Sequence, residues 1–183
     1  MIGYAKKLGR ALRAFGVCEK GVASVELVVV FPFFVGVFLS SYEVAIMNIR
    51  AVMMERAVDV AVRDIRLGGG GDIEHNDVRA RICGEAILIP NCNDVTKIEL
   101  TRIDRETWQA NVEDEADCQD RLDEIKPPKN FKNGAQNDLM LIRVCAVVDS
   151  IFPTFGVGRS IPQDENGGYI LISSSMFVNE PSD

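Results

Sequence analysis

An almost uninterrupted apolar segment near the N-terminus constrains this chain most. From Leu27 to Leu39, thirteen consecutive residues carry no polar side chain, and counting from Val22 to Tyr42 gives twenty-one residues. A helix needs about 20 apolar residues to cross the ~30 Å hydrocarbon core of a bilayer. The segment is therefore long enough to span a membrane, provided that the carboxylate of Glu26 is accommodated within it.

The charge of the chain changes sign at this segment. Residues 1–21 hold five basic side chains and one acidic one, a charge of +4, and because the whole chain carries −7, the remainder carries −11. Lys and Arg accumulate on the cytoplasmic flank of a spanning helix. The pattern predicts a cytoplasmic N-terminus and an acidic body outside the cytoplasm. Such a body lacks the basic surface that neutralises phosphates, so we expect no binding to nucleic acids.

The helical pattern continues beyond the apolar segment, and the residues after Leu39 match a signal-peptidase cleavage motif poorly. Beyond Glu43, apolar residues step alternately by three and four positions, which is typical of a helix face that packs on another helix. These residues are Val44, Met47, Ala51, Met54, Val58, Ala61 and Ile65. One helix of 46 residues over 22–67 accounts for both patterns, with a kink near Pro32. Two helices separated near Ser40 are the alternative.

The body is expected to be α+β, with a helix followed by an antiparallel sheet of about four strands. The glycines at 68–71 predict a flexible hinge, since no Gly-Lys-Ser/Thr sequence follows them. A cap signal at Asp72 predicts a helix over 72–88. Residues 114–136 are polar and contain two prolines, so they predict a surface loop. Alternating or apolar patterns predict four strands, at 97–104, 107–113, 139–148 and 169–178. The first two are expected to form a hairpin that turns around Arg105.

Four cysteines lie in the body, and a fifth, Cys18, lies in the basic N-terminal segment. An even set in an oxidising compartment suggests two disulfides, although free buried thiols are the alternative. Three pairings of four cysteines are possible. We favour Cys83 with Cys92, and Cys118 with Cys145.

The sequence contains no recognisable catalytic or cofactor site. His75 is the single histidine, and with no Cys or acid at metal-ligand spacing it is expected to be a solvated helix residue. No serine has a plausible His and Asp partner set. Residues 164–168 are expected to form a turn. We expect the chain to have no enzymatic activity and to bind no metal or cofactor. A cluster of carboxylates lacks the spacing of a calcium-binding loop and is expected to lie in a solvated loop; it consists of Glu113, Asp114, Glu115 and Asp117.

The stretch "KGVASVELVVVFPFF", with Lys20 before Gly21 and Glu26 at the fifth position after it, resembles the processing site of type IV pilin precursors. It is most similar to the TadE/TadF-like pseudopilins of tight-adherence (Flp) pilus systems. In that family a short basic leader precedes a glycine, four residues, a glutamate and an apolar run with an early proline. The detailed resemblance extends from Lys20 to about Tyr42. Leu27 stands where the major Flp pilins typically have Tyr, and the body is much larger than theirs, so the resemblance favours a minor subunit.

The resemblance implies that a membrane aspartic prepilin peptidase cuts between Gly21 and Val22 on the cytoplasmic side. The apolar helix then stays attached and gains a new amine at Val22, four residues before Glu26. A carboxylate in hydrocarbon costs about 3 kcal/mol and usually has a partner. Glu26 is therefore expected to pair with that amine, in its own chain or in a neighbouring subunit, during assembly.

The resemblance also implies partners and a location. The partners are the prepilin peptidase, other pseudopilins and pilin subunits, the pilus assembly platform and the membrane. The chain is expected in the inner membrane, with its body outside the cytoplasm, until it enters an extracellular pilus. An unprocessed single-pass protein with a binding or sensor body is the alternative, in which Glu26 lies among headgroups. The chain is therefore expected to divide into a basic leader (1–21), the membrane part of the helix (22–43) and its amphipathic continuation (44–67). A glycine hinge (68–71) and the body (72–183) follow.

Overall fold

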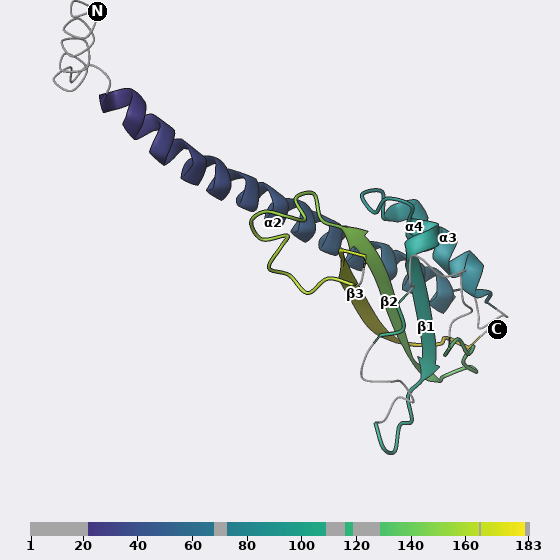
Figure 1. Ribbon diagram of the computed structural model, residues 1–183. Coiled ribbons are helices and arrows are strands. Elements are labelled where there is room, and N and C mark those ends of the chain that lie inside the picture. The colour runs from purple at the N-terminus through teal and green to yellow at the C-terminus, as the bar shows by residue number, and fades with distance from the viewer. Residues whose placement is uncertain (1–21, 68–72, 109–115, 119–128, 165, 182–183) are drawn as a thin grey trace, which may run out of the picture. The chain divides into compact units, whose positions relative to one another are not determined.

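The computed structural model of the chain describes residues 22–67, 73–108, 116–118, 129–164 and 166–181 (Figure 1). The chain divides into two compact units, Met1–Leu39 and Ser40–Asp183. The predicted leader, including Gly21, and the predicted hinge at 68–71 lie outside the described residues.

The long N-terminal helix forms as one element. Helix α2 (Val22–Leu67) contains 46 residues, passes without a break through Ser40, and has Pro32 inside it. The two-helix alternative is therefore not realised. Among the described residues, α2 is the one helix long and apolar enough to cross a membrane, and none of its apolar window is buried against the rest of the chain.

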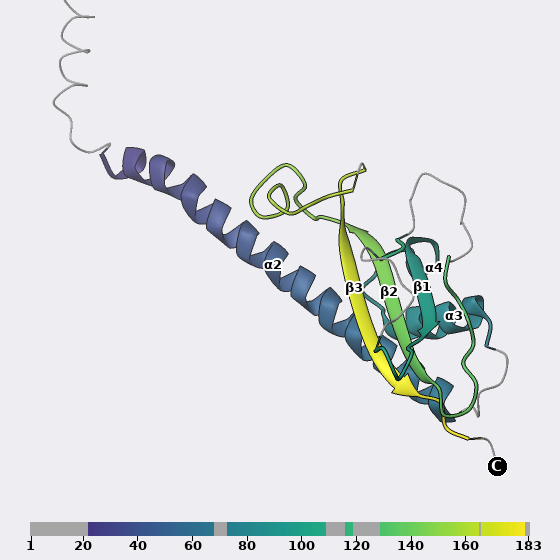
Figure 2. The same cartoon turned by 90° about the horizontal axis from the view of Figure 1, so that it is seen from below.

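The second unit combines the C-terminal part of α2 with two short helices and a sheet. The three strands are antiparallel and lie in the order β1-β2-β3. Figures 1 and 2 show this sheet lying along the C-terminal part of α2, with α3 next to β1. The elements are α3 (His75–Glu85), α4 (Cys92–Val95), β1 (Thr96–Arg102), β2 (Leu139–Asp149) and β3 (Gly168–Val178).

The sheet has three strands among the described residues, where about four were expected. The predicted strand at 107–113 is wrong in the part that the structure describes, because Thr107 lies in a turn and Trp108 has a φ of 56°. The carboxylate of Asp104 accepts a hydrogen bond from the Glu106 amide at 2.8 Å, and the Asp104 carbonyl accepts one from the Trp108 amide. An Asx-type turn thus follows β1 at the point where the second predicted strand was expected to begin. Residues 109–113 lie outside the described residues.

The C-terminal part of α2 belongs to the core of the second unit. The apolar residues predicted to form a buried face are buried there from Met54 onward, whereas Val44 is exposed. They pack in one cluster with residues of α3 and of the inner face of the sheet, such as Ile82, Ile98 and Ile142. The spacing correctly indicated a buried face on the helix. It did not predict that the sheet packs against this face, because periodicity shows that residues are buried but not which element buries them.

Candidate functional site

The predicted processing and assembly residues lie at the start of α2. Gly21 is outside the described residues, and Val22 is the first residue of the helix. Glu26 is exposed, one helical turn further on. Residues four apart on a helix lie on the same face, so the backbone geometry allows the carboxylate of Glu26 to reach a positive group at residue 22.

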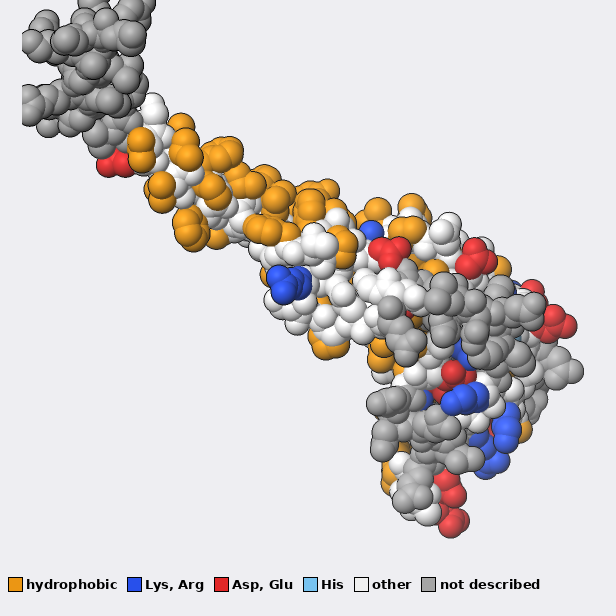
Figure 3. All heavy atoms as spheres, in the orientation of Figure 1, with side chains coloured by type: hydrophobic (Ala, Val, Ile, Leu, Met, Phe, Trp, Pro, Cys, Tyr) orange, Lys and Arg blue, Asp and Glu red, His pale blue; other side chains and the backbone are white. Residues whose placement is uncertain are grey.

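An apolar surface follows Glu26 along the helix. Most side chains over 24–39 are exposed, including Phe33, Phe34 and Phe38, and Figure 3 shows apolar side chains covering this part of α2. Contiguous exposed apolar surface of this extent marks contact with lipid or with another protein. The first unit is thus suited to hydrocarbon or to a bundle of like helices.

A buried carboxylate lies on α2 directly beyond this apolar segment. Glu43 is 1% exposed. Its Oε1 accepts a hydrogen bond from the Phe152 amide at 3.1 Å, and its Oε2 accepts one from the Gly158 amide at 2.8 Å. Burial of a charge requires such partners, and hydrogen bonds to charged groups contribute about 1.5–3 kcal/mol each. Glu43 thereby fixes the loop between β2 and β3 onto α2.

The lack of a side chain at Gly158 makes this contact possible. A Cβ there would lie 2.5 Å from Oε1 of Glu43 and 2.6 Å from the carbonyl oxygen of Phe152. Sequence reasoning missed the role of Glu43. A signal existed, because Glu43 stands four residues before Met47 and is in register with the buried face of the helix.

Arg50 provides a second attachment of α2 to the body. Its guanidinium donates to the carbonyl oxygens of Leu88 at 3.2 Å and Asp149 at 3.1 Å, and to the hydroxyl of Tyr169 at 3.0 Å. The planar guanidinium presents several donors in a fixed arrangement, so one side chain holds three separate segments. Arg50 thus fixes the helix to both ends of the β2–β3 connection, and Glu43, seven residues earlier, fixes it to residues within that connection.

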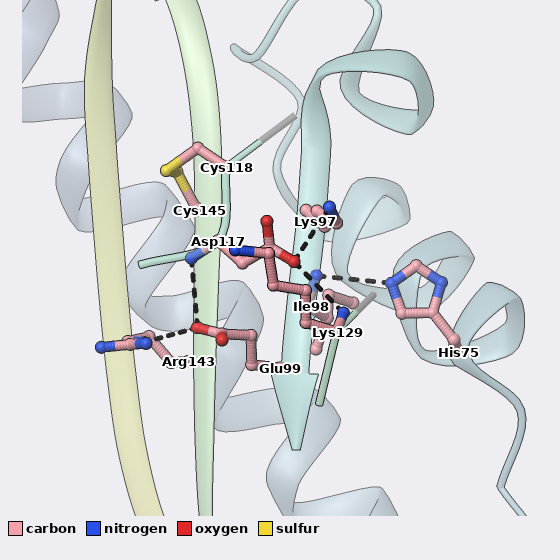
Figure 4. A network of polar contacts seen from close by, with 9 residues as sticks. All are labelled: His75, Lys97, Ile98, Glu99, Asp117, Cys118, Lys129, Arg143 and Cys145. Carbon is pink, nitrogen blue, oxygen red and sulfur yellow. Dashed lines mark hydrogen bonds and ion pairs between the residues drawn. A yellow bond between two sulfur atoms is a disulfide. The ribbon is translucent and has the colours of Figure 1, made fainter. Parts of the chain in front are cut away.

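The outer face of the sheet carries a network of buried polar contacts (Figure 4). Arg143 and Glu99, opposite each other on β2 and β1, form an ion pair at 2.6 Å. Lys97 and Asp117 form a second at 2.9 Å, with side chains 6% and 9% exposed. The Asp117 amide also donates to Glu99 at 3.4 Å, and the Lys129 amide donates to Asp117 at 3.2 Å. Residues 116–118 are therefore bound onto β1 and β2.

This network corrects the expectation of a solvated acidic loop. Asp117 is nearly buried and paired, because its segment folds back onto the cationic side chain of Lys97. Glu113, Asp114 and Glu115 lie outside the described residues. Within the part of the chain that the structure describes, no group of three His, Cys, Asp or Glu side chains could hold a metal ion.

Two disulfides fix the body at the predicted cysteines. Cys83 is bonded to Cys92 and joins α3 to α4, and Cys118 is bonded to Cys145 and joins the segment 116–118 to β2. The second bond lies beside the ion pairs of Figure 4. The cross-link and the ion pairs thus hold the same segment on the outer face of the sheet.

Removing the Cys118–Cys145 bond is expected to be the more damaging of the two losses. The chain-entropy model gives about 3.6 kcal/mol for the 27-residue separation and about 2.7 kcal/mol for the 9-residue separation of Cys83 and Cys92, both as upper values. Urea unfolding of the full chain in detergent, with each pair replaced by alanine, measures both effects. A larger loss for the Cys83 and Cys92 pair contradicts this expectation.

His75 is half-buried and packed, so the expectation of a solvated residue was wrong. Its Nε2 accepts a hydrogen bond from the Ile98 amide at 3.4 Å, and its ring meets that of Phe131 edge-on with centroids 5.3 Å apart. Burial lowers the pKa of His75 and is the largest effect. A hydrogen bond between His75 and the Asn76 side chain raises this pKa, and the positive charges of Arg79 and Lys97 lower it. The fold therefore favours the neutral imidazole.

The lowered pKa of His75 predicts a loss of stability in acid. Below about pH 6.5 the unfolded chain binds a proton at His75 that the folded chain does not bind. The free energy of unfolding is thus expected to fall from that pH until the folded pKa is reached. A His75→Gln variant should lose less stability than the parent between pH 7 and pH 5 in urea titrations. Equal losses in the two proteins would contradict the effect.

The turn expected at 164–168 is present. The carboxylate of Asp164 accepts hydrogen bonds from the amides of Asn166 at 3.1 Å and Gly168 at 2.6 Å, and Gly167 has a φ of 80°. This geometry accounts for Asp164 in the turn, because Asx side chains commonly accept backbone hydrogen bonds in turns.

The body presents a further uncovered apolar surface on β3. This strand ends the strand order, so its outer edge has no neighbour among the described strands. Alternate residues on its outer face are exposed and mostly apolar, namely Ile170, Ile172, Met176 and Val178. No protein-family model, no curated protein and no solved structure matches this chain. The features that bear on its function are an exposed apolar helix with a carboxylate near its start and a disulfide-bonded α+β unit.

Proposed function

We propose that this chain is a minor pseudopilin, similar to the TadE/TadF-like subunits of tight-adherence (Flp) pili. The observation that carries the proposal is the spacing of Gly21 and Glu26 behind a basic leader, at the head of an apolar helix. The start of α2 at Val22 and the exposure of its apolar side chains support it. The chain is held in the inner membrane until it enters the pilus.

Cleavage after Gly21 supplies the partner that Glu26 requires. The carboxylate is exposed on an otherwise apolar part of the helix, where insertion costs about 3 kcal/mol. The new amine at Val22 offsets this cost by pairing, either within the chain or across to Glu26 of a neighbour. Pairing between subunits favours one axial register of neighbouring helices. Fixing a register in this way is the best-attested role of buried charged groups in proteins.

The second unit supports a role in display and subunit contact. Because the C-terminal part of α2 is packed in the body, the exposed side chains over 24–39 form the part of the helix open to neighbouring helices. The two disulfides suit a body outside the cytoplasm. The apolar outer face of β3 offers a surface for the body of an adjacent subunit.

Gly21→Leu is expected to abolish processing. A glycine lets the peptidase approach an extended backbone closely, and a branched side chain at the last leader position obstructs that approach. The variant should stay in the membrane with the mobility of the precursor, as should the unchanged protein in cells that lack the peptidase. Immunoblotting of membrane fractions measures this.

Gly16→Leu, which adds the same side chain within the leader but away from the cut, serves as the matched control. It is expected to be processed normally. A mature-sized Gly21→Leu product would remove the proposed cleavage site. Unchanged mobility of the parent protein without the peptidase would favour the alternative, an unprocessed single-pass binding or sensor protein.

A further inference from the structure

The loop between β2 and β3 is fixed to α2 at the point where the apolar segment ends. Gly156, at a φ of 63°, contacts Ser40 so closely that a Cβ on Gly156 would lie 2.5 Å from the Ser40 hydroxyl. The amides of Phe152 and Gly158 donate to Glu43. Figures 1 and 2 show the loop extending beyond the ends of β2 and β3. Its depth relative to any membrane is therefore set by residues 40–43.

The composition of this loop differs from that of the rest of the chain. Residues 150–163 contain no Asp or Glu and one Arg, Arg159, although the chain holds 27 acidic residues and a net charge of −7. Ile151 and Phe155 are 39% and 48% exposed, and Tyr42 is exposed on the adjacent helix. The loop thus offers apolar and basic side chains, without acidic ones, to whatever it faces.

We propose that residues 150–163 form a membrane-surface element. The side chains of Ile151 and Phe155 enter the boundary between headgroups and acyl chains of a phospholipid bilayer, beside Tyr42, and Arg159 faces anionic headgroups. The inference rests on the membrane span of the proposed function, but not on cleavage at Gly21 or on entry into a pilus.

The length of the apolar segment supports this depth. If α2 crosses the hydrocarbon core between residues 22 and 42, Ser40 and Glu43 lie about 4.5 Å apart along the axis at its outer end. The headgroup region adds about 5–8 Å on each side of the core. A loop in contact with both residues lies at the boundary between the hydrocarbon core and that headgroup region.

Charge favours lipid as the occupant. The chain as a whole is acidic and is repelled by an anionic lipid surface, but this loop carries no negative side chain. Basic side chains are attracted to an anionic membrane surface, and aromatic residues are enriched at the interface. Together with the helix, such a contact gives the body a fixed orientation on the membrane before assembly.

Quenching of tryptophan fluorescence by brominated lipids tests the inference on the full chain in vesicles. The vesicles contain phosphatidylethanolamine and phosphatidylglycerol with brominated acyl chains. The reporter protein carries Trp108→Phe and Phe155→Trp, and a second reporter carries Trp108→Phe and Ile151→Trp. The unchanged protein is the control, because Trp108 is its single tryptophan, is exposed, and follows the opposite end of the sheet, about 35 Å away by strand length. Trp108→Phe with Tyr42→Trp reports the end of the span.

Tryptophan at 155 and at 151 is expected to be quenched by about half, as at 42, because interfacial apolar side chains enter ~5–10 Å into the boundary region. Trp108 should be unaffected. Quenching at 42 without quenching at 155 and 151 overturns the inference while the membrane span stands, and assigns the loop to a protein neighbour. No quenching at 42 removes the span and the inference with it.

Discussion

Replacing Glu26 by alanine is expected to leave cleavage after Gly21 intact and to lower the amount of this subunit in pili at least tenfold. Glu26 lies outside the leader, at the fifth position after the cut, so the mature chain is expected to form and to stay in the membrane. Without the carboxylate, no ion pair with the amine of Val22 forms between subunits. A loss of only about 1.4 kcal/mol per incorporation step corresponds to a factor of ten. Immunoblots of sheared pili and of membranes give the ratio.

A matched control separates the loss of pairing from the loss of a charge on the helix. Glu55 is exposed on the C-terminal part of α2, so Glu55→Ala makes the same chemical change away from the assembly segment. It is expected to enter pili at the level of the unchanged protein. Normal incorporation of Glu26→Ala would remove the pairing argument, and retention of its leader would instead place Glu26 in recognition by the peptidase.

Alanine at Gly158 is expected to lower the thermal midpoint of the body by several degrees. The new Cβ would overlap a carboxylate oxygen of Glu43 and the carbonyl oxygen of Phe152, so the loop must move and the Glu43 hydrogen bonds weaken. Overpacking of this kind costs about 1–3 kcal/mol. For a body of this size, the thermal midpoint falls by about 2–4 °C for each kcal/mol lost from the free energy of unfolding. Circular dichroism of the full chain in detergent measures the midpoint.

The same substitution at Gly84 should act in the opposite direction. Gly84 lies in α3, is exposed, and a Cβ there would meet no atom within 4 Å. Replacing a helical glycine by alanine stabilises by about 0.5–1 kcal/mol. If Gly158→Ala and Gly84→Ala shift the midpoint equally, the contact between Gly158 and Glu43 does not stabilise the body as described.

Local sequence patterns predicted those helices and strands in which buried residues recur at regular intervals. The run of apolar residues and the stepping pattern after it predicted α2 over 22–67, its observed extent. The apolar segments at 139–148 and 169–178 correspond to β2 and β3 within one residue at each end. In each case the residues that are buried lie close in sequence, so their periodicity is visible.

Contacts between distant residues could not be predicted in the same way. Glu43 meets Phe152 and Gly158, which are 109 and 115 residues away. Lys97 and Glu99 alternate with the buried Ile98 along β1, yet both are themselves buried. The segment that covers them includes Asp117, and its position depends on a disulfide and ion pairs that no local pattern encodes.

The mass and N-terminal sequence of the mature protein, purified from membranes of cells that contain the prepilin peptidase, test the central claim most directly. A processed pseudopilin is expected to begin at Val22 and to lack the 21 residues before it. Its amine is then four residues from Glu26. A chain that still begins at Met1, or one that begins near Val44 after loss of the apolar segment, would contradict the proposed function.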